Sequence, residues 1–482
     1  MTAILKNFIG GEWVDGSGVT RNINPSNTND LVGEYAKADK AQTEKAIAAA
    51  KAAFPAWSQS TPQARFDALN KISLEILARK EELGRLLARE EGKTLPEGIG
   101  EVARAGQIFA FFAGEALRLI GEKGASVRPG LDVELTREPV GVVGMITPWN
   151  FPIAIPAWKI APALCYGNTV VFKPAELVPG SGHALAEIIT RSGIPAGVFN
   201  LVVGSGSVVG QTLLESPDVA AISFTGSVQT GRKIAQACVL SNPMKKFQLE
   251  MGGKNPLVVL DDADLKTAVE VAVNGAYFST GQRCTASSRL IVTEGIHDRF
   301  VAAVAERLAG LSVDDALKAG VHIGPVVDQS QLDQDLRYIK IGQDEGAKLA
   351  FGGELLKREN PGHYLAPALF TEANNNMRIA REEIFGPVAA VIRAKNYEEA
   401  LAISNDTEFG LASGICTTSL KYASHYKRNS ESGMVMVNLP TAGVDYHVPF
   451  GGRKGSSYGA REQGSYAREF YTTVKTAYTF PG

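Results

Sequence analysis

The sequence contains little cysteine and no pattern of metal ligands. Only four of its 482 residues are cysteine. They lie far apart and show neither the CxxC nor the Cys/His spacing of a zinc site or disulfide framework: Cys165, Cys238, Cys284 and Cys416. We therefore expect no bound metal, and a reducing location, the cytoplasm.

Charge and hydropathy argue against two further classes of protein. The formal net charge is −2, and no basic run is long enough to follow a nucleic-acid backbone, so nucleic acid is not an expected partner. No apolar stretch approaches the length of a membrane span, and no membrane association is expected. The N-terminal segment MTAILKNFIGGEWVDG has a single lysine and no cleavage-type ending, which is not typical of a signal peptide.

The length and composition instead indicate a folded protein with more than one domain. Hydrophobic residues make up 45% and charged residues 21%, a balance too apolar for disorder. A chain of 482 residues exceeds what one hydrophobic core usually organises, so two or three domains are expected.

The segment from Thr61 to Glu91 is predicted to be a helix. Thr61 can cap its N-terminus, Pro62 suits its first turn, and apolar residues recur at helical spacing as far as Leu87. Its other face is charged, which indicates a packing helix with one solvated side.

Beyond Arg137, short apolar runs alternate with segments that can form helices. The runs are VVGMI at 142–146, TVVF at 169–172, FNLVV at 199–203 and VAAISF at 219–224. Apolar runs of this kind favour parallel strands covered on both faces, and their repetition predicts a doubly wound α/β sheet. A second α/β region begins near Asn255. The polar stretches at 121–137 and after about 463 suit neither sheet, and we expect them to pair with each other or with another subunit.

The residues that follow these strands can form a dinucleotide site, because ligands of open α/β sheets bind at the carboxyl ends of strands. Lys173 and Glu176 can hold two ribose hydroxyls, although a solvated pair is the alternative. The glycines at 204, 206 and 210 differ by one residue from the GxGxxG fingerprint, and turn chemistry explains them equally well. Ser227 opens a helix whose N-terminal amides can face phosphate.

Cys284, in the stretch FSTGQRCTASS, is the candidate nucleophile. It lies between an apolar helix ending near Phe278 and a strand, and Gly281 allows a turn where backbone can approach a substrate closely. The other three cysteines are predicted to be small buried apolar residues. Glu250 is the candidate general base, and Asn150, with the backbone N–H of Cys284, is the candidate oxyanion donor. The alternative is that these polar residues end separate loops and do not converge.

The chain resembles the NAD(P)-dependent aldehyde dehydrogenase superfamily over nearly its whole length. The matching stretches, in the family's order, are TPWNFP, FKPAE, FTGS, LEMGGKNP, GQRC, EEIFGP and PFGGRKG. The resemblance implies an α/β aldehyde dehydrogenase fold in a homodimer or homotetramer. Its expected parts are a Rossmann-like cofactor domain at 1–120 and 138–250, an α/β catalytic domain at 251–440 and a β oligomerisation arm at 121–137 and 463–482.

The same resemblance implies residue roles. The catalytic residues would be Cys284 as nucleophile, Glu250 as base, Asn150 as oxyanion donor, and Lys173. Glu383 would bind the nicotinamide-side ribose, Phe385 would lie beside the nicotinamide, and Lys173 and Glu176 would hold the adenine ribose. The full set implied to contact the cofactor is Ile146, Thr147, Pro148, Trp149, Lys173, Ala175, Glu176, Gly206, Gly210, Phe224, Gly226, Ser227, Met251, Gly252, Glu383 and Phe385.

The expected reaction is oxidation of a small-molecule aldehyde to a carboxylic acid. The Cys284 thiolate adds to the carbonyl, the thiohemiacetal gives hydride to the nicotinamide, and Glu250 activates water to hydrolyse the thioester. Related enzymes that pass the acyl group to coenzyme A typically lack this glutamate. A carboxylate at Glu176 would repel a 2′-phosphate, so NAD is favoured over NADP, although a shift of the loop would admit both.

The sequence leaves the choice of aldehyde open. FSTGQRCTASSRLIV and PFGGRKGSSYGAREQG look most like bacterial α-ketoglutaric semialdehyde (2,5-dioxovalerate) dehydrogenases, which form 2-oxoglutarate. In succinic semialdehyde dehydrogenases arginines occupy the positions of Trp158 and Phe278, and this departure is typical instead of broad-range aliphatic and aromatic aldehyde dehydrogenases. The expected substrate contacts are Phe151, Ile155, Trp158, Phe278, Arg283, Thr285 and Phe450.

Two alternatives concern the residue that meets a charged substrate and the class of protein. Arg283 or Arg453 can meet an acidic substrate tail, but Arg283 is equally suited to a structural ion pair behind its loop. A non-catalytic NAD-binding protein on the same fold is the alternative from another class. Retention of Cys284, Glu250, Asn150 and Glu383 together disfavours it.

Overall fold

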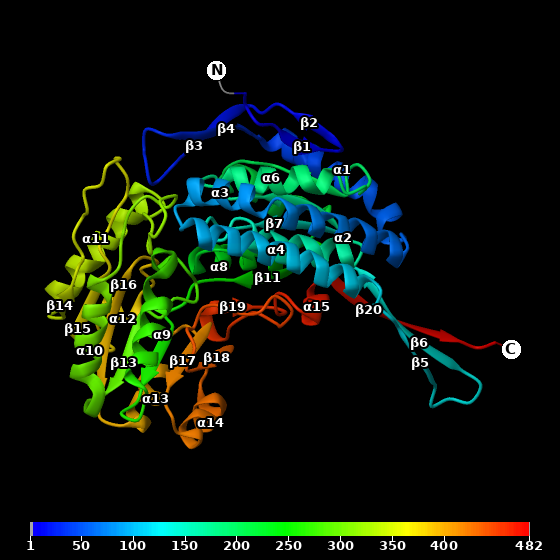
Figure 1. Ribbon diagram of the computed structural model, residues 1–482. Coiled ribbons are helices and arrows are strands. Elements are labelled where there is room, and N and C mark those ends of the chain that lie inside the picture. Colours follow the sequence, from blue (N-terminus) through cyan, green and yellow to red (C-terminus); the bar gives the residue numbers. More distant parts are fainter. Residues whose placement is uncertain (1–2, 482) are drawn as a thin grey trace.

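The computed structural model describes residues 3–481, which form two α/β sheets and a projecting β arm (Figure 1). No helix in this described range is both long and apolar enough to cross a membrane.

The first sheet has eight strands with a parallel centre. In spatial order they are β19 (Ser457–Tyr458), β11 (Lys246–Glu250), β10 (Val219–Thr225), β7 (Val142–Ile146), β8 (Thr169–Lys173), β9 (Phe199–Leu201), β1 (Asn7–Ile9) and β2 (Glu12–Val14). The four predicted apolar runs form β7 to β10. The short strand β19, from near the C-terminus, pairs antiparallel with β11, so this sheet includes residues outside the segments predicted for the cofactor domain.

The second sheet has seven strands and is parallel except at β14. In spatial order they are β14 (Lys348–Phe351), β15 (Ala368–Ala373), β16 (Val388–Ala394), β13 (Arg289–Thr293), β12 (Pro256–Val259), β17 (Ala412–Cys416) and β18 (Met434–Val437). Separate hydrophobic clusters pack against the two sheets, as expected for a chain too long for one core.

The arm is a three-stranded sheet that projects away from both α/β regions (Figure 1). β20 (Thr472–Thr479) pairs antiparallel with β6 (Asp132–Pro139), which pairs with β5 (Glu122–Ala125). The two polar stretches therefore do pair with each other. A hairpin of β3 (Gly18–Ile23) and β4 (Leu31–Lys37) completes the strands.

Helices cover both large sheets (Figure 1). Those of the first region are α1 (Lys40–Ser58), α2 (Pro62–Ala78), α3 (Lys80–Glu91), α4 (Leu95–Ala116), α5 (Ala154–Cys165), α6 (Pro179–Thr190), α7 (Gln211–Glu215) and α8 (Val228–Leu240). Those that follow are α9 (Leu265–Tyr277), α10 (Glu294–Ala309), α11 (Gln329–Asp344), α12 (Arg378–Arg381), α13 (Tyr397–Asn405), α14 (Leu420–Asn429) and α15 (Arg468–Tyr471).

The single helix predicted from Thr61 to Glu91 is wrong in one respect, because the chain forms two helices there. Thr61 does cap α2 by accepting from the N–H of Ala64, but the helix ends at Arg79, which has non-helical φ and ψ of −103° and 13°. The break suits the sequence, since Glu81 and Glu82 then lie at the N-terminus of α3, where the helix dipole favours negative charge.

Candidate active site

The loop that carries Cys284 is folded by an unusual turn. α9 ends at Tyr277, and Ser279 and Thr280 then take left-handed φ values of 51° and 57°. Glu97 holds this turn by accepting from the backbone N–H and the hydroxyl of Ser279, at 2.8 and 2.9 Å. Gly281 is required for contact with protein, not with a substrate as predicted, because a Cβ there would lie 2.2 Å from the carbonyl oxygen of Gly386.

Asn255 fixes the other side of the same loop. Its Nδ2 donates to the carbonyl oxygens of Cys284 and Ala286, at 2.8 and 2.9 Å, and its Oδ1 accepts from the N–H of Ala412 at 2.9 Å. Asn255 is not among the residues predicted from the sequence, although it lies within the stretch LEMGGKNP. Its role depends on segments more than a hundred residues away along the chain.

The Cys284 thiol lies between two cavities and is protonated at rest. Burial, together with the negative charges of Glu383 and Glu250, raises its pKa to about 12, although the backbone N–H groups of Cys284 and Thr285 act in the opposite direction. A thiolate must therefore form by proton transfer when the substrate binds. The other three cysteines are buried and unpaired, in agreement with their prediction as small apolar residues.

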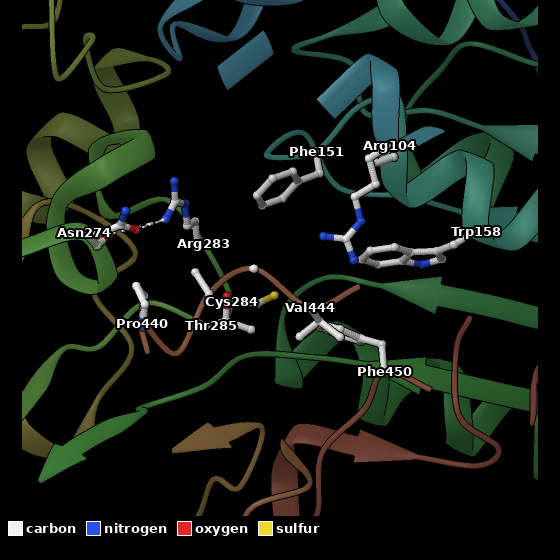
Figure 2. Close-up of a pocket in the computed structure, with 13 residues that line it drawn as sticks. Arg104, Phe151, Trp158, Asn274, Arg283, Cys284, Thr285, Pro440, Val444 and Phe450 are labelled. Atoms are coloured by element: carbon white, nitrogen blue, oxygen red, sulfur yellow. Dashed lines mark hydrogen bonds between the residues drawn. The ribbon is translucent and has the colours of Figure 1, made fainter. Parts of the chain in front are cut away.

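The first cavity, of about 330 Å³, has apolar walls and two arginines (Figure 2). Trp158 and Phe450 form one wall, with stacked rings whose centroids are 5.1 Å apart. The residues that line it are Arg104, Phe151, Ala154, Trp158, Asn274, Arg283, Cys284, Thr285, Pro440, Ala442, Gly443, Val444 and Phe450. No aspartate or glutamate of the described chain is among them.

Two predicted substrate contacts lie elsewhere. Ile155 lines the second cavity. Phe278 packs against the hydrophobic cluster around α9 because the left-handed turn after it redirects the chain. Arg283 does line the first cavity, where it can meet an acidic substrate tail. Its Nη2 also forms a structural ion pair with Glu97 at 3.1 Å.

The second cavity, of about 220 Å³, meets the first at Cys284. Most of its walls follow the strands of the first sheet. They are Pro148, Trp149, Asn150, Ile155, Thr225, Gly226, Ser227, Met251, Gly252, Cys284, Gln331, Gln334, Glu383 and Phe385. Trp149 meets Phe385 edge to face at 5.3 Å, and Glu383 accepts from the N–H of Gly253 at 2.9 Å. Burial raises the pKa of Glu383 to about 7.

Several features of this rim fit a dinucleotide. The hydroxyls of Thr147 and Thr225, at the ends of β7 and β10, are buried without a hydrogen-bond partner in the described protein. Ser227 caps α8 by accepting from the N–H of Thr230, which leaves other N-terminal amides available to phosphate. Gly252 has no room for a side chain, since a Cβ would lie 2.2 Å from the Glu383 carboxylate.

Other predicted cofactor residues lie at the strand ends but not on the cavity wall. Lys173 is buried and donates to the carbonyl oxygens of Pro174 and Gly204, at 3.0 and 2.9 Å, and burial lowers its pKa to about 8. Glu176 pairs with Lys37 at 3.1 Å. The other predicted cofactor residues outside the cavity lining are Ile146, Thr147, Ala175, Gly206, Gly210 and Phe224.

The glycines do not form the turn of a GxGxxG fingerprint. The segment Gly206–Gly210 is a single π-helical turn that leads into α7. Gly204 is needed for packing, because a Cβ there would lie 2.7 Å from Val209. Packing, which was not among the expected reasons for these glycines, therefore accounts for Gly204.

Asn150 and Glu250 approach Cys284 from the first sheet. Asn150 lines the second cavity, and its Nδ2 donates to the carbonyl oxygen of Gln282 at 3.0 Å. Glu250, at the end of β11, accepts from the Ser457 hydroxyl and lines neither cavity. Burial, together with the charge of Glu462, raises the Glu250 pKa to about 8. A carboxyl with this pKa can exchange protons near neutral pH.

Comparisons with known proteins agree with this arrangement. Residues 13–477 match the model of the aldehyde dehydrogenase family. The chain is 45% identical over 479 residues to alpha-ketoglutaric semialdehyde dehydrogenase of Bacillus subtilis (strain 168), covering 98% of each chain. It is 39% identical over 469 residues to 2,5-dioxopentanoate dehydrogenase of Saccharolobus solfataricus, covering 97% of this chain and 98% of the relative.

Among solved structures, betaine aldehyde dehydrogenase of Staphylococcus aureus in complex with NAD+ superposes with a TM-score of 0.96 at 34% identity, covering 99% of this chain and 94% of that one. These matches confirm the predicted fold. The chain therefore belongs to the aldehyde dehydrogenase family.

Proposed function

We propose that this enzyme oxidises an acidic aldehyde, α-ketoglutaric semialdehyde, to the dicarboxylic acid 2-oxoglutarate with NAD(P)+. The observation that carries the proposal is the charge of the first cavity. Arg104 and Arg283 both line it beside Cys284, and no carboxylate of the described chain does. Such a cavity attracts an anionic substrate and disfavours a cationic one such as betaine aldehyde.

The similar proteins support the same substrate. The relatives from Bacillus subtilis and Saccharolobus solfataricus are named for the same five-carbon keto acid aldehyde and match this chain over nearly its full length. The Trp158 and Phe450 wall favours the second candidate, a broad-range enzyme for uncharged aldehydes.

The chemistry follows from the residues around the nucleophile. Cys284 gives its proton to water and its sulfur adds to the aldehyde carbon, while Asn150 and the backbone N–H of Cys284 stabilise the oxyanion. NAD(P)+, when bound, accepts the hydride that leaves this carbon. Glu250 then takes a proton from water, whose oxygen attacks the thioester carbon and displaces the Cys284 sulfur. The carboxyl must rotate away from Ser457 to reach that water.

The cofactor contacts are assigned on the rim of the second cavity. Trp149, Ser227, Glu383 and Phe385 would contact the nicotinamide half and the phosphates, and Lys173 and Glu176 the adenine ribose. The Lys37 ammonium beside Glu176 offsets part of the repulsion of a 2′-phosphate, so both NAD and NADP are included.

The proposal extends to the whole chain. The first sheet would bind the cofactor, the second would carry the nucleophile loop, and the arm would join subunits of a homodimer or homotetramer. A cytoplasmic location is also part of it, because all four cysteines are unpaired.

The test is NADH formation at 340 nm with α-ketoglutaric semialdehyde, succinic semialdehyde, hexanal, benzaldehyde and betaine aldehyde, with Cys284→Ala as the blank. We expect the keto acid aldehyde to exceed hexanal in kcat/KM by about tenfold or more, which corresponds to about 1.4 kcal/mol of transition-state preference. Equal values for the two would favour the broad-range enzyme instead.

A further inference from the structure

Arg104 enters the first cavity from α4, on a different side from Arg283 (Figure 2). The centre of its guanidinium lies 5.9 Å from the centroid of the Trp158 ring, a cation–π contact with the wall of the cavity. Arg104 is not among the predicted substrate contacts, because nothing in its local sequence marks it.

The two arginines of the cavity differ in how their charge is balanced. Arg283 forms an ion pair with Glu97 at 3.1 Å. Arg104 forms no ion pair within residues 3–481. Its Nη2 donates only to an uncharged acceptor, the side-chain oxygen of Gln463, at 3.1 Å.

Two carboxylates act electrostatically on Arg104 but form no ion pair with it in the described chain. Glu101 and Asp445 act on its charge from a distance. Glu101 is already occupied, since it accepts from Lys93 at 2.7 Å and from the N–H groups of Ile153 and Ala154 at 3.0 and 3.1 Å. Burial lowers the pKa of Arg104, as expected for a cation withdrawn from water without a counter-ion.

Unpaired donors also lie on and around Arg104. Arg104 Nε, Trp158 Nε1 and Gln463 Nε2 are all buried N–H groups with no acceptor among the described residues. Buried donors are nearly always paired in folded proteins. Arg104 also lines the cavity, so an acceptor that enters the cavity can meet its guanidinium. A carboxylate supplies several acceptor positions and matches the planar fork of a guanidinium.

We propose that Arg104 is the specificity residue that binds the distal carboxylate of the substrate. This inference rests on the proposed function, since it requires an acidic aldehyde. Arg283, held by Glu97, then contributes positive charge to the cavity without binding the carboxylate itself. Arg104 thus takes over the task that arginine at the position of Trp158 would otherwise perform.

The experiment compares the native enzyme with Arg104→Met, Arg104→Lys and a control, Arg118→Met. Arg118 follows α4, is exposed and lies outside the cavity, so the control removes the same charge from a nearby surface. Each variant is assayed with α-ketoglutaric semialdehyde and with hexanal. Valerate, which has the carboxylate but no aldehyde, is tested as a competitive inhibitor of hexanal oxidation.

For Arg104→Met we expect kcat/KM for the semialdehyde to fall on the order of 100-fold, mainly through KM, because a charge-assisted pair of hydrogen bonds is lost. For hexanal, kcat/KM should change by less than about threefold, because this substrate has no charged group for Arg104 to bind. Inhibition by valerate should weaken in parallel. For Arg104→Lys, kcat/KM with the semialdehyde should lie between the values of the native enzyme and of Arg104→Met, because lysine keeps the charge but not the planar pair of N–H donors. Arg118→Met should match the native enzyme.

Two results would overturn the inference while leaving the proposed function intact. One is a native preference for the semialdehyde that persists in Arg104→Met. The other is an equal loss with both substrates, which indicates a structural role. If Arg104→Met does not fold, the ratio between the two substrates in Arg104→Lys decides in the same way. A native enzyme without preference for the acid overturns the proposed function itself.

Discussion

The Ser457 hydroxyl donates a hydrogen bond to Glu250 Oε2 over 2.5 Å. The two residues are directly paired across β19 and β11, so a segment near the C-terminus fixes the carboxyl of the candidate base. Glu250 is buried and Ser457 is half-buried, and the charges of the buried Lys159–Glu462 ion pair act on the Glu250 carboxyl. The Glu250 carboxyl must therefore break its hydrogen bond with Ser457 before it can accept a proton from water.

Replacing Glu250 is expected to separate the two halves of the reaction. In Glu250→Gln the thioester should still form, giving a burst of about one NADH per active site, while steady-state turnover falls by about 10²- to 10⁴-fold, the usual contribution of a general base. Stopped-flow absorbance at 340 nm measures both phases. Loss of the burst would show instead that Glu250 is needed to form the nucleophile.

The rate of thioester hydrolysis is expected to rise with pH. Because the pKa of Glu250 is about 8, the carboxyl is protonated below that pH and cannot accept a proton from water. The rate should therefore increase about tenfold per pH unit below 8 and level off above it. In Ser457→Ala the profile should move to higher pH, because the hydrogen bond from Ser457 lowers the Glu250 pKa. A profile unchanged by this substitution would contradict the assignment.

The Lys37–Glu176 pair is expected to set the choice between NAD and NADP. In Glu176→Gln the negative charge that repels a 2′-phosphate is lost, and the NADP to NAD ratio of kcat/KM should rise by about tenfold. Lys37→Met leaves the Glu176 carboxylate without its counter-ion and should move the ratio in the opposite direction. Initial rates with both cofactors measure these ratios, and parallel shifts in the two variants would count against the assignment.

The arm is expected to join subunits. Val474 and Tyr478 on β20 are 57% and 59% exposed, and apolar side chains on a projecting strand are typical of a surface covered by another copy. Val474→Lys should therefore lower the molar mass measured by light scattering after gel filtration. Leu420→Lys, on exposed α14, is the matched control and should leave the mass unchanged. A monomeric native protein would contradict the prediction.

Local sequence determined the strands, the helix caps and the chemical candidates of this protein. The continuous apolar runs could only be strands covered on both sides, and Thr61 and Pro62 mark a helix start by their own chemistry. Cys284, Glu250 and Asn150 could be selected in advance because each follows or precedes a predicted strand in a distinctive stretch. Their convergence could not, since it depends on how the two sheets meet.

Tertiary structure alone decided which charges face the substrate. Arg104 and Gln463 are 359 residues apart in sequence and hydrogen bonded in the fold, and no periodicity relates them. The same holds for Glu97 and Arg283, and for β19, which joins a sheet built mainly from residues far earlier in the chain. Local patterns record how a segment meets its own neighbours, whereas a cavity forms from side chains that only long-range packing brings together.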